Sequence, residues 1–197
     1  MSWIKETAFE NASPEVRKLI DITKGQQNSI DNIIKVHSLR PHTLTGHLSL
    51  YKNALHHSAN TLPLWYLETI GVYVSLLNKC EYCVAHHVEG IKKNYADANE
   101  ALQIIEALEK GKPENFFSGY FLEGLHYAKI LTLSASSVRE DDIHKLRNVG
   151  FSDGEILEIN QVCAYFNYAN RTVLGLGVAL DGDVLGFSPN DVVNIPV

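Results

Sequence analysis

Two cysteines, a histidine and a glutamate stand close enough in the sequence to build a thiol-redox centre. Cys80 and Cys83 are separated by two residues, and His87 follows after three more. In a helix that begins near Cys80 these positions lie within roughly 60° of one another, because an α-helix turns about 100° per residue. Both sulfurs and the imidazole should therefore share one helix face.

Glu68 precedes Cys80 by twelve residues and can reach this face only if the chain reverses between them. On one continuous helix the two residues would be about 18 Å apart. A turn at Asn78-Lys79 would instead leave Glu68 roughly 13 Å before the turn and His87 about 10 Å beyond it. The carboxylate then lies beside the imidazole, and the expected order is Glu68, His87 and the two sulfurs.

This order is that of a proton relay to a thiol. The thiolate is the reactive form of cysteine, and a free thiol with a pKa of about 8.5 is only slightly ionised at neutral pH. A helix N-terminus stabilises the thiolate, a neighbouring base takes its proton, and an acid behind the histidine fixes the tautomer. We expect Cys83, Cys80, His87 and Glu68 to be the catalytic residues, with a reversible Cys80–Cys83 disulfide and no bound cofactor or metal.

Each of these residues also has a plainer interpretation. The two cysteines could pack in the core, or could bind zinc with His87 and a fourth ligand. Against zinc, no second pair of cysteines or histidines has finger-like spacing. His86 should be solvated or packed, Cys163 should be a core thiol, and the His56-His57 pair should interact with a helix end.

Helical patterns fill almost the whole chain, and no run of strict alternation is long enough for a strand. Helix signals include Ser13-Pro14, Pro41, Pro63 and the S-x-x-E capping box that begins at Ser152. The expected helices cover about residues 14–23, 28–39, 41–55, 63–77, 80–94, 97–108, 119–133, 138–149 and 152–180. The fold class should be all-α, with antiparallel helical hairpins.

Composition and charge limit the domain organisation, partners and location. The chain has 197 residues, a net charge of −6 and 17 scattered Lys and Arg residues, so we expect no nucleic-acid partner. It should be one domain over 1–197, with a helical extension at 1–40 and a C-terminal arm at 181–197. The start lacks a signal peptide and the longest apolar stretch, 70–77, cannot span a bilayer, so we expect a cytoplasmic protein without a membrane partner.

Apolar residues around one helix favour self-association. Trp65, Tyr66, Val72 and Tyr73 spread around the helix expected at 63–77 instead of forming one stripe. A helix that is apolar on several faces must be buried on several sides, and closed homo-oligomers commonly supply such burial. We therefore predict a homo-oligomer.

The spacing Glu68, eleven residues, Cys80-x-x-Cys83-x-x-x-His87 resembles the motif of the alkylhydroperoxidase D-like, or carboxymuconolactone decarboxylase-like, proteins. Residues 80–87, Cys-Glu-Tyr-Cys-Val-Ala-His-His, look most like the peroxidase-related branch, as do stretches between 146 and 171. The resemblance covers roughly residues 40–180. Tyr82 stands where the best-studied type of the family has a histidine, and a phenol cannot act as a base at neutral pH.

The resemblance implies an AhpD-like orthogonal helical bundle that assembles as trimers or hexamers. It also implies peroxidase activity on small hydroperoxides, with electrons returned by an external dithiol such as a lipoyl group. Cys83 would attack the peroxide, Cys80 would resolve the sulfenic acid as a disulfide, and Glu68 and His87 would relay protons. The alternatives are a general disulfide reductase, a non-catalytic helical oligomer that is zinc-stabilised or purely structural, and, third, a decarboxylase.

Overall fold

A computed structural model describes residues 2–7, 11–23 and 29–186, and within them the chain is helical and contains no strand. The all-α prediction is confirmed. None of the described helices is both long and apolar enough to cross a membrane. In chain order the α-helices are α1 (Pro14–Thr23), α2 (Asn32–Val36), α3 (Pro41–Leu55), α4 (Leu64–Leu77), α5 (Glu81–Asn94), α6 (Ala98–Glu109), α7 (Gly119–Leu133), α8 (Glu140–Asn148) and α9 (Asp153–Leu176).

Local signals set most helix boundaries. Pro41 occupies the first turn of α3, and the Ser152 hydroxyl accepts a hydrogen bond from the Glu155 N–H in a capping box that starts α9. α9 ends at Leu176, four residues before the predicted end, because Gly177 adopts a left-handed conformation with φ of 62°. The helix expected at 28–39 is shorter in the structure: α2 covers Asn32–Val36 and a 3₁₀ turn follows at His37–Leu39, while residue 28 lies outside the described ranges.

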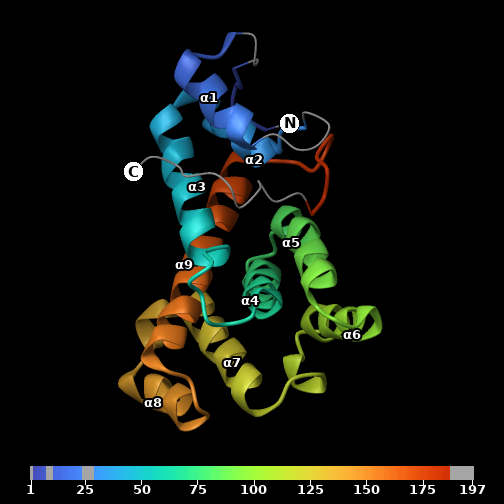
Figure 1. The fold of residues 1–197 in the computed structure, drawn as a ribbon, viewed down its shortest axis with the longest axis vertical. Helices are drawn as coiled ribbons and strands as arrows, with labels where there is room; N and C mark the ends of the chain where they lie inside the picture. The colour runs from blue at the N-terminus through green and yellow to red at the C-terminus, as the bar shows by residue number, and fades with distance from the viewer. Residues whose placement is uncertain (1, 8–10, 24–28, 187–197) are drawn as a thin grey trace.

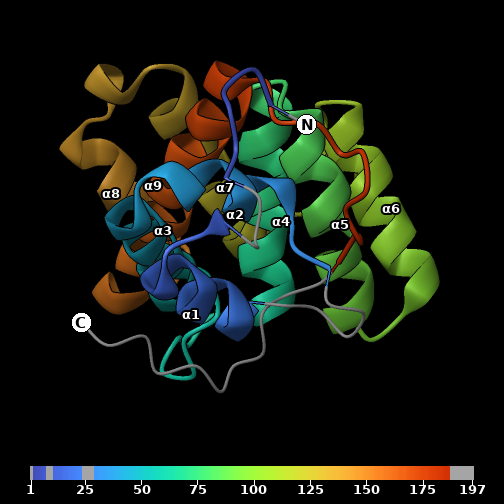
Figure 2. The same ribbon diagram turned by 90° about the horizontal axis from the view of Figure 1, so that it is seen from above.

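Helix α4 lies in the middle of the molecule, with α5, α6, α7 and α9 packed around it (Figures 1 and 2). Tyr66, Val72 and Tyr73 are buried within one chain. The expectation that a second subunit buries this helix is therefore wrong for these three side chains, because the chain covers them by itself, while Trp65 is half-buried. The oligomer stays a prediction, and the large apolar side chains that a partner could cover lie elsewhere; Leu102, Leu133 and Leu157 are more than half exposed.

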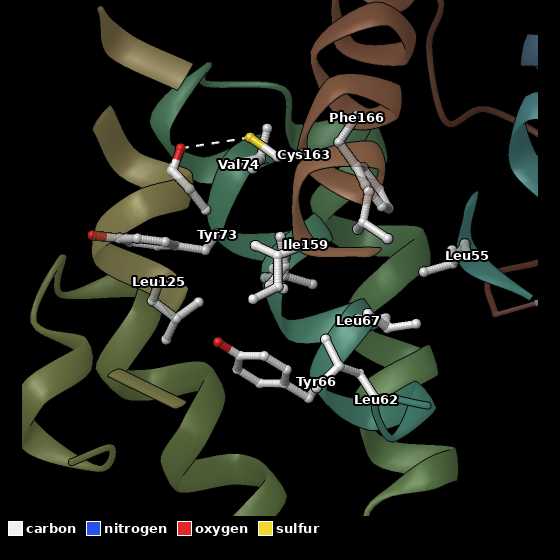
Figure 3. Close-up of a cluster of buried hydrophobic side chains, with 14 of the residues drawn as sticks. Leu55, Leu62, Tyr66, Leu67, Tyr73, Val74, Leu125, Ile159, Cys163 and Phe166 are labelled. Carbon is white, nitrogen blue, oxygen red and sulfur yellow. Dashed lines mark hydrogen bonds between the residues drawn. The ribbon is translucent and has the colours of Figure 1, made fainter. Parts of the chain in front are cut away.

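The contact between α4 and α9 forms the centre of the core. Figure 3 shows Ile159, Cys163 and Phe166 of α9 facing the side chains of α4. Phe166 approaches α4 at Gly71, where an added Cβ would lie 2.2 Å from the ring. Cys163 is fully buried and its sulfur lies 3.4 Å from the Thr132 hydroxyl, so the prediction of a core thiol is confirmed.

The predicted reversal between α4 and α5 is present. Asn78 ends α4, Lys79 has a positive φ of 58°, and Cys80 stands at the N-cap position of α5. The Asn78 amide donates hydrogen bonds to Asn167 and Asn170 of α9, at 3.0 and 2.9 Å. The turn is thus held by α9 as well as by its own backbone.

The segments before α2 and after α9 pack against each other. The Asn32 side chain donates hydrogen bonds to the carbonyls of Ala179 and Asp181, and its backbone N–H donates to the Asp183 carboxylate. The C-terminal segment passes beside α2 and α5 in Figure 1. The described start of the predicted C-terminal arm, 181–186, therefore packs on the body; 187–197 lie outside the described residues.

Candidate functional site: a cavity at the start of helix α5

The two cysteines lie at the N-terminus of α5, in contact with α9. Cys80 is fully buried and Cys83 is 4% exposed. Both sulfurs receive hydrogen bonding from the Asn170 amide of α9, which lowers the pKa of both thiols as a secondary effect. Asn170 is itself fully buried and donates to the Ser75 hydroxyl at 3.0 Å. Asn170 lies in the stretch that resembles the family, but its sequence context indicates no role at the thiols.

The two thiols have opposite pKa shifts. Hydrogen bonding from the Cys83 thiol lowers the pKa of Cys80, and backbone N–H groups at the helix start add to this effect against the opposing effect of burial. The same interaction, together with burial, raises the pKa of Cys83 well above its usual value. Of the two thiols, Cys80 therefore loses its proton first, and Cys83 keeps its proton more strongly.

Glu68 and His87 meet across the hairpin, as the sequence predicted. Nδ1 of His87 lies 2.7 Å from Oε2 of Glu68, and the Glu68 side chain is only 2% exposed. An ionised carboxylate accepts this hydrogen bond, so Nδ1 carries the proton and Nε2 is left as the basic nitrogen. Oε1 of Glu68 lies 3.8 Å from Nε2 of His56, so His56 faces the relay in addition to ending α3.

Gly90 leaves the space that the Glu68 carboxylate occupies. A Cβ at Gly90 would lie 2.5 Å from Cδ of Glu68 and 2.7 and 2.8 Å from its two oxygens. Gly90 stands three residues after His87, on the same face of α5. A larger residue there would push the carboxylate away from the imidazole.

These side chains line one cavity of about 70 Å³. Its wall contains Cys83, His87 and Glu68, whereas Cys80 does not line it. A water needs about 10–15 Å³ of such space, so the cavity has room for about five waters or a comparably small molecule. Access therefore favours Cys83 as the sulfur that meets a ligand, although ionisation favours Cys80.

His47 of α3 also lines the cavity, and the sequence analysis did not single it out. Burial lowers its pKa to about 3, with His37 adding to the shift, so the imidazole is neutral at physiological pH. Its Nδ1 has no hydrogen-bond partner among the described residues. The sequence gives no signal that His47 lines the cavity, because the residues that it faces there come from distant segments of the chain.

The prediction that His86 is solvated or packed is confirmed as packing, because its ring lies against that of Tyr82 with the centroids 4.7 Å apart; the structure adds contacts that were not predicted. The His86 side chain is 10% exposed, lines the cavity, and has Nε2 3.5 Å from Oδ2 of Asp183. Asp31 lines the same wall, where burial raises its pKa to about 6 and Asp183 adds to the rise. The helix places His86 away from His87, as expected, but the segments carrying Asp31 and Asp183 cover that side.

Tyr82, between the two cysteines, joins the segments that carry Asp31 and Asp183 to α5; these segments and His86 form a second wall of the cavity. Its hydroxyl donates to Oδ2 of Asp183 at 2.5 Å and accepts a hydrogen bond from the Ile33 N–H at 3.2 Å. Burial and the bond to Asp183 raise the pKa of Tyr82 far above its ordinary value. The phenol therefore holds the terminal segments on α5 and does not act as a base.

Within the described ranges, one group of three or more potential metal ligands comes close together: Asp31, His86 and Asp183, whose ligand atoms lie within 4.8 Å of one another. Cys80, Cys83 and His87 do not form such a group, so the geometry gives the zinc alternative no support at the positions where the sequence placed it.

The comparisons with known proteins agree with this geometry. Residues 43–109, which contain both the relay and the two cysteines, match the model of the carboxymuconolactone decarboxylase family. This segment of the chain is therefore similar to that family. No curated protein matches at a significant level.

Solved structures extend the AhpD-like fold to nearly the whole chain. A peroxidase-related protein from Ralstonia eutropha JMP134, described as an alkylhydroperoxidase AhpD core, has a TM-score of 0.78 at 20% identity and covers 96% of this chain and 98% of its own. One from Silicibacter sp. TM1040 has a TM-score of 0.73 at 21% identity, covering 90% and 91%. A variant of the debrominase Bmp8 in complex with 2,3,4-tribromopyrrole has a TM-score of 0.70 at 15% identity, covering 92% and 94%. The fold thus occurs in proteins that are named for different reactions.

Proposed function

We propose that this protein is a thiol peroxidase that reduces small hydroperoxides through Cys83 and Cys80. The observation that carries the proposal is the joint placement of Cys83, His87 and Glu68 on one cavity, with the imidazole 2.7 Å from the carboxylate. The names of the structural neighbours, which include peroxidase-related proteins and an AhpD core, support the same class of reaction.

The reaction balances with the residues present and an external dithiol. The Cys83 thiolate attacks one peroxide oxygen, the O–O bond breaks, and the alcohol or water leaves after it takes a proton from protonated His87. Cys80 then attacks the sulfur of the Cys83 sulfenic acid, forms the disulfide and releases water. A dithiol of the lipoyl type reduces the disulfide by thiol–disulfide exchange and becomes a disulfide itself.

Loss of one proton from the thiol pair provides the nucleophile. In the resting pair the charge favours Cys80, and transfer of the Cys83 proton to Cys80 or to His87 places the charge on the sulfur that faces the cavity. Glu68 stabilises the imidazolium that forms at His87. The relay therefore sets the rate at which Cys83 becomes reactive, and His87 returns the proton to the oxygen that leaves.

The size of the cavity limits the substrate. Room for about five waters fits hydrogen peroxide or a short alkyl hydroperoxide. Turnover should therefore fall as the alkyl group of the hydroperoxide grows.

The test uses Cys83→Ser, Cys80→Ser and the matched Cys163→Ala variant, with hydroperoxide consumption measured in the presence of a reduced lipoyl dithiol. Cys83→Ser should lose turnover, whereas Cys80→Ser should complete one half-reaction and retain a Cys83 sulfenic acid that a carbon nucleophile can trap. Mass spectrometry of the oxidised wild type should show a loss of two hydrogens between residues 80 and 83. Cys163→Ala should keep turnover.

Three results would contradict the proposal. Peroxide turnover by Cys83→Ser would remove Cys83 from the attacking role, and a mixed disulfide with Cys163 would exclude the Cys80–Cys83 pair. Failure of the wild type to consume any hydroperoxide, while its Cys80–Cys83 disulfide still exchanges with dithiols, would instead support the general disulfide reductase.

A further inference from the structure

Three side chains from distant parts of the sequence converge on the flank of α5 next to the Glu68–His87 pair. Asp31 precedes α2, His86 lies in α5, and Asp183 follows α9. Their potential ligand atoms lie within 4.8 Å of one another. Hydrogen bonds of the neighbouring Asn32 to the C-terminal segment hold the first and third of these segments together.

The group is buried and incompletely satisfied. The Asp183 side chain has no exposed surface and that of His86 is 10% exposed. Oδ1 of Asp31 and Nε2 of His86 have no hydrogen-bond partner among the described residues, although each is shielded from solvent. Buried polar atoms without partners are rare in folded proteins, and they commonly mark a site for a bound water or ion.

The charge of the group calls for a cation. Two carboxylates face each other, and the only ion pair that either makes within the described ranges is that of Asp183 with His86. The Lys35 ammonium donates instead to the Asn32 side chain at 2.8 Å and acts on Asp31 only at longer range. Buried charges are unfavourable unless they are paired or coordinate a metal.

The donor set indicates the kind of cation. Two carboxylate oxygens and one imidazole nitrogen are ligands of intermediate hardness, suited to Mn²⁺ or Fe²⁺ more than to ions that prefer thiolates. Ligand atoms around such an ion at about 2.1 Å lie roughly 3–4.2 Å apart, so small side-chain movements would close the present group around it. Tyr82 donates to Asp183 and would orient that carboxylate as an outer partner of the ion.

We propose that Asp31, His86 and Asp183 form a divalent-cation site that fastens the segments before α2 and after α9 onto α5. The ion would complete the second wall of the cavity without contacting the cysteines. The site differs from the zinc alternative of the sequence analysis in all of its ligands. It also stands independently of the peroxidase proposal, since none of its ligands belongs to the thiol relay.

Mn²⁺ titration of the full-length, chelator-treated and reduced protein tests the site, with free Mn²⁺ followed by electron paramagnetic resonance. Mn²⁺ suits the test because thiolates prefer softer ions. The wild type should bind one Mn²⁺ per chain. Asp31→Asn and His86→Gln should each raise the dissociation constant at least about tenfold. Asp31→Asn keeps the shape of a side chain whose Oδ1 makes no hydrogen bond, so this variant should fold.

Two matched controls carry the same changes at exposed positions. Asp181→Asn alters a carboxylate two residues from Asp183, and His144→Gln alters a histidine of α8; both should bind Mn²⁺ as the wild type does. A Cys80→Ser/Cys83→Ser double variant should also bind normally, which separates this site from the thiols. The proposal is overturned if no saturable binding occurs up to about 1 mM free Mn²⁺, or if binding survives both ligand variants.

Discussion

Two neighbouring histidines of α5 enter two different environments of one cavity. His87 faces Glu68 of α4, in a hairpin whose parts are close in sequence. His86 faces Asp31 and Asp183, which are separated by most of the length of the chain. One wall of the cavity, with Glu68 and His87, is formed by residues that are close in sequence. The second wall, with Asp31 and His86 beside Asp183, forms only when the segments before α2 and after α9 pack on α5.

The two walls also differ in how their carboxylates are satisfied. Glu68 has a short hydrogen bond to its histidine, whereas Asp31 has an oxygen without a partner and a pKa of about 6 that reflects its burial. A satisfied carboxylate orients and stabilises an imidazolium, which is what a relay needs. A carboxylate oxygen without a partner, close to a second carboxylate, is a place for a cation. Adjacent residues of one helix can therefore serve separate purposes.

The largest expected effect tests whether the two histidines differ in the thiol chemistry. His87→Gln should lower the rate of Cys83 oxidation by hydroperoxide by about 10²–10⁴-fold, the usual contribution of a positioned acid–base group. His86→Gln should lower it far less. Glu68→Gln should resemble His87→Gln, and the double variant should be little worse than either, because groups that act as one unit are not additive.

Stopped-flow oxidation of the reduced protein measures these rates, with His144→Gln as the control for loss of a histidine. Equal losses in the His86 and His87 variants would break the distinction between the walls. Multiplying losses at Glu68 and His87 would show that these two residues act separately.

The second effect concerns the stability of the folded protein in acid and tests whether the region around His47 of α3 unfolds first. An unfolded His47 binds a proton below pH about 6.5, but the folded imidazole does so only near pH 3, because of its burial and of His37. The unfolded state therefore binds more protons in this window. The free energy of unfolding should fall by as much as about 4 kcal/mol as the pH drops from 6.5 toward 3, and it should not change on this account above 6.5.

Urea unfolding of the wild type and of His47→Phe measures this slope, and the variant should be less sensitive to acid. The groups around His47 are His37, whose pKa burial also lowers, and the rings of Tyr165 and Tyr168. In mild acid, amide hydrogen exchange should show that α1–α3 unfold before the α4–α5 hairpin. Simultaneous opening of both regions would contradict the comparison.

The smallest expected effect sharpens the geometry of the reactive wall. Gly90→Ala places a methyl group where the Glu68 carboxylate lies, so it should lower the rate of Cys83 oxidation about tenfold, or roughly 1.4 kcal/mol in activation free energy. Gly46→Ala in α3 is the control, since nothing lies within 4 Å of its added Cβ. A wild-type rate in Gly90→Ala would mean that the carboxylate need not occupy this position.

The sequence predicted the elements and the reactive wall because both depend on nearby residues. Prolines, the capping box at Ser152 and helical periodicity define the helices, and the twelve-residue spacing of Glu68 and Cys80 leaves room for one tight turn. The contact between Glu68 and His87 followed from helix geometry alone. Gly177 is a helix-terminating signal for α9, but the apolar residues after it suggested a longer helix.

Only the tertiary structure decided what surrounds that wall. His47, Asn170 and Asp183 reach the site from α3, α9 and the C-terminal segment, and no local pattern predicts which distant segments will meet. The same reason makes the oligomer argument fail at α4: its several apolar faces indicate burial, but they do not distinguish burial by the chain's own helices from burial by a second subunit. Helix periodicity sets the direction of a side chain, and packing across the whole chain sets what that side chain contacts.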